Sequence, residues 1–284
     1  TSAIAEDTED HVTEATKDVT IVDTVTYEQL EVGREYTVKG VLMDKATGKA
    51  VLVDGKEVTS ETTFTAEEQN GNVDVIFTFD ASALEGTTTV VFETLYTEGK
   101  EVTVHADLRD AGQTVYLPKI RTHAQDGINE IDHTEALEKA TIIDTVTYTN
   151  LLPGKEYTVT GTLMDKETGE AVLIDGKPIT ASTTFTAETA EGSVDIVFEF
   201  DASAIAGTTV VAFESMEYKG IEVAVHADIE DENQTVYIPD VHTTATATDT
   251  EDHVTGANEE VTITDEVALT GLKVDNEYTI KGVL

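Results

Sequence analysis

The chain has 284 residues and no Cys, so no disulfide can stabilise it. Lys and Arg number 17 against 57 Asp and Glu, which gives a formal net charge of −40 at pH 7. This charge argues against binding to nucleic acid, which needs a basic face, and to anionic membranes. Hydrophobic residues still make up 39% of the chain, enough for packed cores. No apolar run approaches the roughly 20 residues of a membrane span, and the first residues show no signal-peptide pattern.

The first third of the chain shows the patterns of short β-strands. Alternating or β-branched runs occupy residues 20–27, 35–42, 73–79 and 87–92. Asp54-Gly55 and Gly99-Lys100 between such runs predict tight turns. Residues 81–84 could form one helical turn. Many short strands at this spacing predict an antiparallel β-sandwich.

A repeat of 121 residues divides the chain. Gln113-Thr114-Val115-Tyr116 recurs as Gln234-Thr235-Val236-Tyr237, and 234 − 113 = 121. A third copy begins near Val241 and stops at Leu284. We therefore divide the chain into module 1 (residues 1–119), module 2 (120–240) and module 3 (241–284), the last being the N-terminal part of a truncated copy. The unit is too long for a solenoid repeat, so the sequence predicts an all-β protein of tandem Ig-like antiparallel β-sandwich modules. The joints are short, which predicts a semi-rigid rod.

Two recurring motifs stand out. Residues 105–115 read H-x-D-x-x-D-x-x-Q-T-V, and residues 226–236 repeat the pattern. Residues 211–214 read V-A-F-E, and residues 90–93 read V-V-F-E. In this order the motifs resemble the VaFE-repeat, or ester-bond, domains of Gram-positive surface adhesins and pilus-like stalks. The resemblance covers both complete modules and the start of module 3.

The resemblance implies an intramolecular ester in each complete module. A Thr in the opening strand attacks the side-chain amide of the QTV Gln, and ammonia leaves. The implied cross-links join Thr1 to Gln113 and Thr122 to Gln234. The implied catalytic groups are Asp23, Glu93 and His105 in module 1 and Asp144, Glu214 and His226 in module 2. In module 3 the equivalents are Thr243 and Asp265, which should stay unbonded because the copy lacks its Glu, His and Gln.

The chemistry of the residues supports this assignment. A Thr hydroxyl needs a base to become a nucleophile, and an amide needs a donor at its oxygen and a proton for the departing nitrogen. A His can move protons, and a buried carboxyl group with a raised pKa can donate one. The sequence does not say which carboxyl group performs which task. The ester must be kept from water, so we expect Phe92 and Phe213 to lie beside it.

Other acidic residues are open to two interpretations. Asp107, Asp110, Asp228 and Asp231 either stabilise turns or support the His, and we favour the first. Two acidic groups, Glu6, Asp7, Glu9 and Asp10 and then Asp249, Glu251 and Asp252, either form solvated loops or bind Ca²⁺, and we favour solvated loops. We expect no cofactor and no metal.

Three classes of function remain. The leading hypothesis is a passive stalk segment of a bacterial surface adhesin, cross-linked by single-turnover self-modification and not an enzyme on external substrates. The alternative is an adhesive module that binds a host protein or glycan through loops at the sandwich ends. A hydrolase using His and carboxylates is the weakest, because the implied site is buried. The expected partners are neighbouring modules and a host ligand held by a distal tip. The resemblance implies an extracellular, wall-anchored location.

Overall fold

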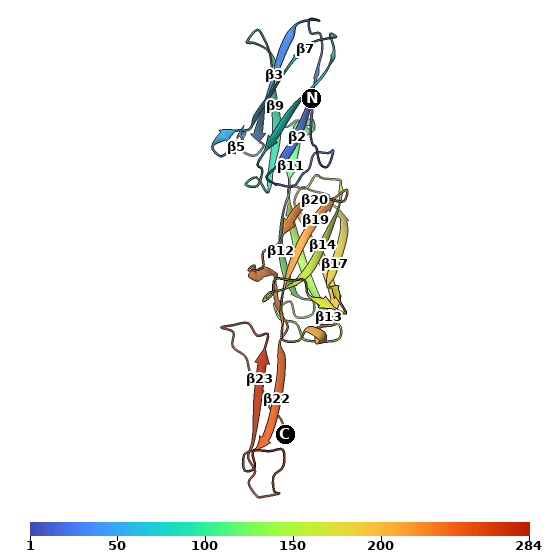
Figure 1. Ribbon diagram of the computed structural model, residues 1–284. Helices are drawn as coiled ribbons and strands as arrows, with labels where there is room; N and C mark the ends of the chain where they lie inside the picture. The colour runs from blue at the N-terminus through green and yellow to red at the C-terminus, as the bar shows by residue number, and fades with distance from the viewer.

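The computed structural model describes residues 1–284, which form three parts stacked along one long axis (Figure 1). Each complete module is built from two main antiparallel sheets and a small two-stranded one, and module 3 is a single hairpin. The predicted all-β, tandem sandwich fold is confirmed. No helix is long and apolar enough to cross a membrane.

Module 1 contains a three-stranded sheet, in the order β1-β2-β8, and a larger sheet ordered β10-β9-β3-β4, in which β7 also pairs with β3 and β11 with β9. Its elements are β1 (Ser2–Ala5), β2 (Val19–Tyr27), β3 (Glu35–Asp44), β4 (Lys49–Ala50), β5 (Leu52–Val53), β6 (Lys56–Glu57), β7 (Thr59–Thr65), β8 (Gly71–Phe79), β9 (Thr87–Thr97), β10 (Lys100–His105), the 3₁₀ helix η1 (Ala111–Gln113) and β11 (Thr114–Leu117). All four predicted strand segments are strands. Residues 81–84 form a turn and not a helix.

Module 2 repeats this plan, with sheets ordered β12-β13-β18 and β17-β14-β19-β20. Its elements are β12 (Lys119–Asp126), β13 (Ala140–Thr149), β14 (Glu156–Asp165), β15 (Leu173–Ile174), β16 (Lys177–Pro178), β17 (Thr180–Thr186), β18 (Gly192–Phe200), η2 (Ala202–Ile205), β19 (Thr209–Tyr218), β20 (Ile221–His226), η3 (Glu232–Gln234) and β21 (Thr235–Tyr237). The helical turn absent from module 1 is present here as η2. Module 3 contributes the hairpin of β22 (Asp240–Ala247) and β23 (Ile263–Thr270).

One edge of β19 is shared by two partners. β20 pairs with β19 over residues 214–218, and β21 pairs with it over residues 209–211. Between the two pairings the chain leaves the edge through η3. This detour places the end of η3 next to the opening strand β12, which also lies beside β20 and β21. The first and last elements of the module therefore meet.

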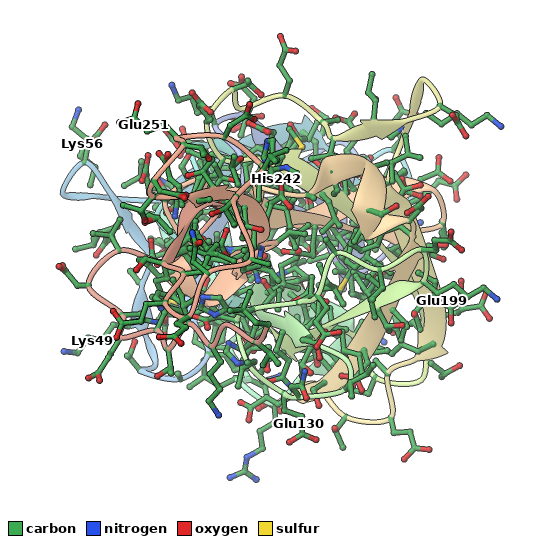
Figure 2. All side chains as sticks on the ribbon, turned by 90° about the horizontal axis from the view of Figure 1, so that it is seen from below. Lys49, Lys56, Glu130, Glu199, His242 and Glu251 are labelled. Carbon is green, nitrogen blue, oxygen red and sulfur yellow. The ribbon has the colours of Figure 1, made fainter.

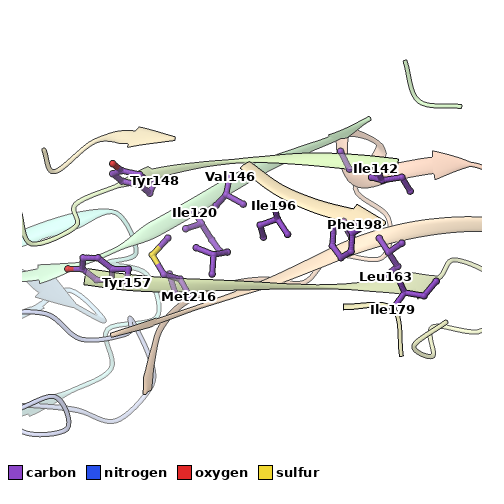
Figure 3. Packing of buried hydrophobic residues seen from close by; sticks show 14 of the residues in the cluster. Ile120, Ile142, Val146, Tyr148, Tyr157, Leu163, Ile179, Ile196, Phe198 and Met216 are labelled. Carbon is purple, nitrogen blue, oxygen red and sulfur yellow. The ribbon is translucent and has the colours of Figure 1, made fainter. Parts of the chain in front are cut away.

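The core of module 2 lies between its two sheets. In β14 every second residue from Tyr157 to Leu163 is buried, as expected for a strand with one face on a core. Figure 3 shows Ile196 and Phe198 pointing toward the sheet that carries Leu163 and Met216. Each such side chain contributes about 1.5–3 kcal/mol when fully buried. Charged side chains point outward around the long axis, as Lys56, Glu130 and Glu199 show in Figure 2.

A glycine in β14 leaves room for an aromatic ring from the facing sheet. Gly161 pairs with Glu214 on β19, and a Cβ at Gly161 would lie 2.5 Å from Cζ of Phe198. Because no side chain projects from Gly161, the Phe198 ring can lie against the strand, next to the position of Glu214. Gly40 and Phe77 repeat the arrangement in module 1, where Gly40 pairs with Glu93.

Gly161→Ala should destabilise module 2 by about 1–3 kcal/mol, because the new methyl group overlaps the Phe198 ring in a packed core. Thermal unfolding would measure this as a lower midpoint. Ser193→Ala, an exposed site on β18, is the control and should change stability by no more than about 0.5 kcal/mol. Equal midpoints for the two variants would show that the ring is not held by the glycine.

Candidate functional site

The five residues predicted to carry the chemistry of module 2 meet between its sheets. Thr122 on β12 and Asp144 on β13 face inward from the three-stranded sheet. Glu214 and His226 face them from β19 and β20, where they are cross-strand neighbours. Gln234 arrives at the end of η3. All five are buried.

Each reacting group is held by one carboxyl group. The Thr122 hydroxyl Oγ1 donates a hydrogen bond to Glu214 Oε2 at 3.0 Å. The Gln234 amide Nε2 donates to Asp144 Oδ1 at 3.5 Å. The carboxyl groups of Asp144 and Glu214 are close enough to share a hydrogen bond when one of them is protonated. The carboxyl pair therefore links a nucleophile from the start of the module to an amide from its end.

Three oxygen atoms at this site are buried without a partner: Asp144 Oδ2, Glu214 Oε1 and Gln234 Oε1. A buried acceptor left unpaired costs about 1–3 kcal/mol, and such groups concentrate where chemistry takes place. A proton shared by the two carboxyl groups turns two acceptors into a donor and an acceptor. The geometry thus favours a pair that holds one proton.

The pKa values agree with a singly protonated pair. Burial, and then the charge of Asp144, raises the pKa of Glu214 to about 10. Burial raises the pKa of Asp144 to about 6, although the hydrogen bond with Glu214 acts to lower it. At neutral pH Glu214 is therefore the neutral acid and Asp144 the carboxylate. Such a pair titrates as a unit.

Asp231 connects His226 to η3, and the sequence had left its role open. His226 Nε2 lies 3.0 Å from Asp231 Oδ2, while Asp231 Oδ1 accepts a hydrogen bond from the backbone N–H of Asn233 at 2.9 Å. Asp231 thus caps the turn that carries Gln234 and holds the His as well, so both interpretations of this residue apply. In module 1, Asp110 makes the same contacts to His105 and Gly112. The signal in the sequence is the second Asp of H-x-D-x-x-D.

The first Asp of each motif has a local role. Asp107 accepts a hydrogen bond from the backbone of Arg109 at 2.9 Å, and Asp228 accepts one from Glu230 at 3.0 Å. These contacts close a turn in each module, in agreement with the structural role we favoured.

Module 1 assembles the same groups less completely. Gln113 Nε2 donates to Asp23 Oδ1 at 3.1 Å, and burial raises the pKa of both Asp23 and Glu93, the latter to about 10. Thr1, however, is exposed and donates no hydrogen bond to Glu93, whose carboxyl oxygens have no partner. Thr1 lines the same groove as Glu93 and His105, but its hydroxyl is not held by the carboxyl group of Glu93.

The residues before Thr122 lie close to the site of module 2. Ile120 is fully buried in the core of module 2, and Arg121 lies 3.5 Å from His226 Nδ1. They cover the site, so the His226 side chain is only 10% exposed, against 42% for His105.

The expectation that Phe92 and Phe213 lie beside the ester is wrong. Both are half-buried on the face opposite the adjacent Glu, because successive residues of a strand point to opposite sides. Phe77 of β8 and Phe198 of β18 lie instead against Gly40 and Gly161, the strand partners of Glu93 and Glu214. Both rings are almost fully buried.

Module 3 holds only part of the constellation. Thr243 on β22 and Asp265 on β23 are exposed, and the register places Ala245 opposite Asp265, as Ala124 stands opposite Asp144. That Thr243 stays unbonded remains a prediction. No group of three or more His, Asp or Glu side chains in residues 1–284 is arranged to hold a metal ion.

The first acidic loop is not simply solvated, contrary to our interpretation. The Asp10 side chain is only 14% exposed and contacts module 2. Asp7 accepts a hydrogen bond from the Thr13 hydroxyl within the loop. The second acidic group, residues 249–252, is largely exposed, as expected.

The raised pKa of Glu214 predicts how the stability of an uncross-linked module 2 depends on pH. Unfolded Glu ionises near its ordinary pKa, whereas folded Glu214 keeps its proton until about pH 10. The stability from this group is therefore complete at low pH and declines as pH rises, by at most about 1.4 kcal/mol per pH unit.

This dependence can be measured in Gln234→Ala, which cannot form the ester. The free energy of unfolding of module 2 would be measured by urea titration, with hydrogen exchange of module 2 peptides as the readout. It should fall between about pH 5 and about pH 9. Adding Glu214→Gln should flatten the dependence. An equal slope with and without Glu214 would contradict the assignment.

Comparisons with known proteins bear on this geometry. A sequence model of the T-Q ester bond containing domain matches residues 1–117, 118–238 and 239–284. A bacterial adhesin from Mobiluncus mulieris, described as containing intramolecular disulfide, isopeptide and ester bond cross-links, is 15% identical, with 95% of each chain covered and a TM-score of 0.35. A glycosyl hydrolase family 2 member from Bacteroides cellulosilyticus is 9% identical over 82% of this chain and 28% of that chain, with a TM-score of 0.32.

These structural likenesses are too weak to carry an argument. No curated protein matches the chain by sequence. The three matches to the family, in contrast, extend from the first residue to the last, and the resemblance seen in the motifs is confirmed. The chain belongs to the family of T-Q ester bond containing domains.

Proposed function

We propose that the chain is a stalk segment of a bacterial surface adhesin in which each complete module cross-links itself through a Thr–Gln ester. One observation carries the proposal. In module 2, a hydroxyl from the opening strand and an amide from the closing segment are buried together on a singly protonated carboxyl pair. Membership of the T-Q family supports the same chemistry.

The contacts suggest a proton relay. Thr122 Oγ1 attacks the amide carbon of Gln234 while its proton passes to Glu214 Oε2, which already accepts its hydrogen bond. Glu214 passes its own proton to Asp144, and Asp144 delivers it to Gln234 Nε2. One C–O bond forms, one C–N bond breaks and ammonia leaves, so atoms and protons balance. Folding supplies the proximity, which can contribute about 7–11 kcal/mol of the barrier.

His226 takes a positioning role in this scheme. Arg121 can only donate, so it faces an acceptor at Nδ1, and Nε2 then carries the proton that His226 donates to Asp231. Asp231 caps η3, and η3 ends at Gln234. His226 thus holds the turn that presents the amide. Its place beside Glu214 on the neighbouring strand also excludes water from the relay.

The consequence of the bond is mechanical. It joins β12 to the end of η3, and 111 residues lie between Thr122 and Gln234 (234 − 122 − 1 = 111). Closing a loop of this length stabilises a fold by about 5 kcal/mol on the chain-entropy model. Tension that enters at one end of the module leaves through covalent bonds at the other. A chain without Cys gains a staple that reduction does not open.

The buried site also supports self-modification over turnover of external substrates. Asp144, Glu214 and Gln234 are at most 1% exposed, so no foreign ester or glycoside can reach them. The rod of stacked modules suits a spacer (Figure 1). The net charge of −40 keeps such a spacer soluble. Location at the bacterial surface and attachment to the wall are part of this proposal.

Single-molecule pulling tests the mechanical role. Module 2 should not extend when it is cross-linked, whereas Gln234→Ala should release the 111 residues between the bonded side chains. The added contour length should be roughly 350–400 Å at about 3.3–3.6 Å per residue. Gln69→Ala, in an exposed loop of module 1, is the control and should behave as the native chain. Full extension of native module 2 would refute the proposal.

The relay predicts which carboxyl groups set the rate. Glu214→Gln and Asp144→Asn should each slow ester formation by about 10²–10⁴-fold, the usual contribution of a positioned proton-transfer group. The rate would be followed by mass spectrometry as ammonia is lost after refolding. Glu217→Gln, exposed on the same strand, should leave the rate unchanged. Unchanged rates in both site variants would remove the carboxyl pair from the mechanism.

A further inference from the structure

We propose that the loop of residues 6–13 in module 1 and the apex of module 2, defined as Lys155, Tyr218 and Lys219, form a carboxylate-specific joint that fixes the orientation of one module on the next. Domains joined by short linkers move relative to each other unless their interface prevents it. The proposed ester bonds would lie within modules and would not restrict this motion. The joint is therefore independent of the proposed cross-link.

The loop presents one carboxylate to module 2. Its backbone is fixed to the last strand of module 1 by hydrogen bonds between Thr13 N–H and Tyr116 O and between Tyr116 N–H and His11 O. Within the loop, the Thr8 hydroxyl donates to Val12 O at 2.5 Å. Asp10 therefore projects from a rigid support and not from a mobile acidic tail.

The apex receives this carboxylate with three donors. Asp10 Oδ2 accepts hydrogen bonds from the Tyr218 hydroxyl at 2.6 Å, Lys155 Nζ at 3.1 Å and Lys219 Nζ at 3.2 Å. Burial acts to raise the pKa of Asp10, but the hydrogen bonds outweigh it and hold that pKa well below its ordinary value. Lys219 also donates to the backbone oxygen of Thr8. One carboxylate thus makes three contacts across the joint.

An apolar contact accompanies the charged one. Val12 is fully buried, and it belongs to the core cluster of module 2 although it lies in module 1. The neighbouring Tyr116 packs against the same cluster. A side chain inserted into the core of the next domain resists bending in more than one direction. The carboxylate alone would allow rotation about its contact point.

The second joint repeats the chemistry with different residues. Asp132 of module 2 lies 2.7 Å from Lys273 Nζ of module 3, and His133 Nε2 lies 2.8 Å from the Tyr278 hydroxyl. By the 121-residue offset Tyr278 corresponds to Tyr157, next to the apex of module 2. In both joints the preceding module therefore supplies a carboxylate and the following module supplies a lysine.

The apex of module 1 carries a different set of residues. The 121-residue offset places Arg34, Thr97 and Glu98 where module 2 has Lys155, Tyr218 and Lys219. Arg34 is already paired with Glu98 at 3.1 Å and with Glu31 at 2.9 Å. An incoming aspartate would meet a glutamate there. The loop of module 1 thus fits the apex of module 2 and not its own, so the joint also specifies the order of modules.

Distance measurements between spin labels in the full chain test the joint. The chain has no Cys, so Ile76→Cys and Val197→Cys, both exposed and equivalent in β8 and β18, can be labelled specifically. The parent should give one narrow distance distribution. Asp10→Asn should broaden it, and Lys219→Glu, which installs the residue of the module 1 apex, should broaden it at least as much.

Glu9→Gln is the matched control, because it removes the same charge from the same loop at an exposed position. Its distribution should remain narrow. A distribution in Asp10→Asn as narrow as in the parent would overturn the proposal, as would equal broadening in Glu9→Gln. Loss of ammonia from module 2 should be unchanged in every variant, which separates failure of the joint from failure of the cross-link.

Discussion

The carboxyl pair of Asp144 and Glu214, holding one proton between a hydroxyl and an amide, is the interaction on which the rest of module 2 depends. Two like carboxylates cannot both ionise in a dry interior, so one of them remains an acid at neutral pH. The fold maintains this state. Gly161 leaves room for the Phe198 ring, Ile120 and Arg121 of the opening strand cover the site, and the departure of η3 from the edge of β19 brings the amide of Gln234 to it.

Much of this was readable from the sequence. Alternating segments such as residues 35–42 predicted strands correctly, and the 121-residue offset made each motif residue appear twice. The prediction that Phe92 lies beside the site was wrong, although the sequence alone held the information needed to reject it. Neighbours in a strand face opposite sides, so Phe92 cannot share the face of Glu93. Phe77, which lies against the glycine opposite Glu93, belongs to β8 and is brought there only by the packing of two sheets.

The contacts of Asp10 with module 2 could not be predicted in the same way. Its partners Lys155 and Tyr218 lie 145 and 208 residues away in the sequence, and acidic residues in a loop are usually solvated. The motif residues are different, because their positions relative to one another recur within each module. Local pattern and repetition therefore identified the site, whereas the contact between modules required the three-dimensional structure. Two kinds of link emerge, a proposed covalent one within modules and a non-covalent one between them.

Mass spectrometry of the folded chain tests the central claim most directly. We expect an intact mass lower than the sequence mass by one ammonia for each cross-linked module. Proteolysis should then yield a branched peptide in which Thr122 is joined to Gln234. The full sequence mass, with Thr122 and Gln234 recovered on separate peptides, would contradict the account.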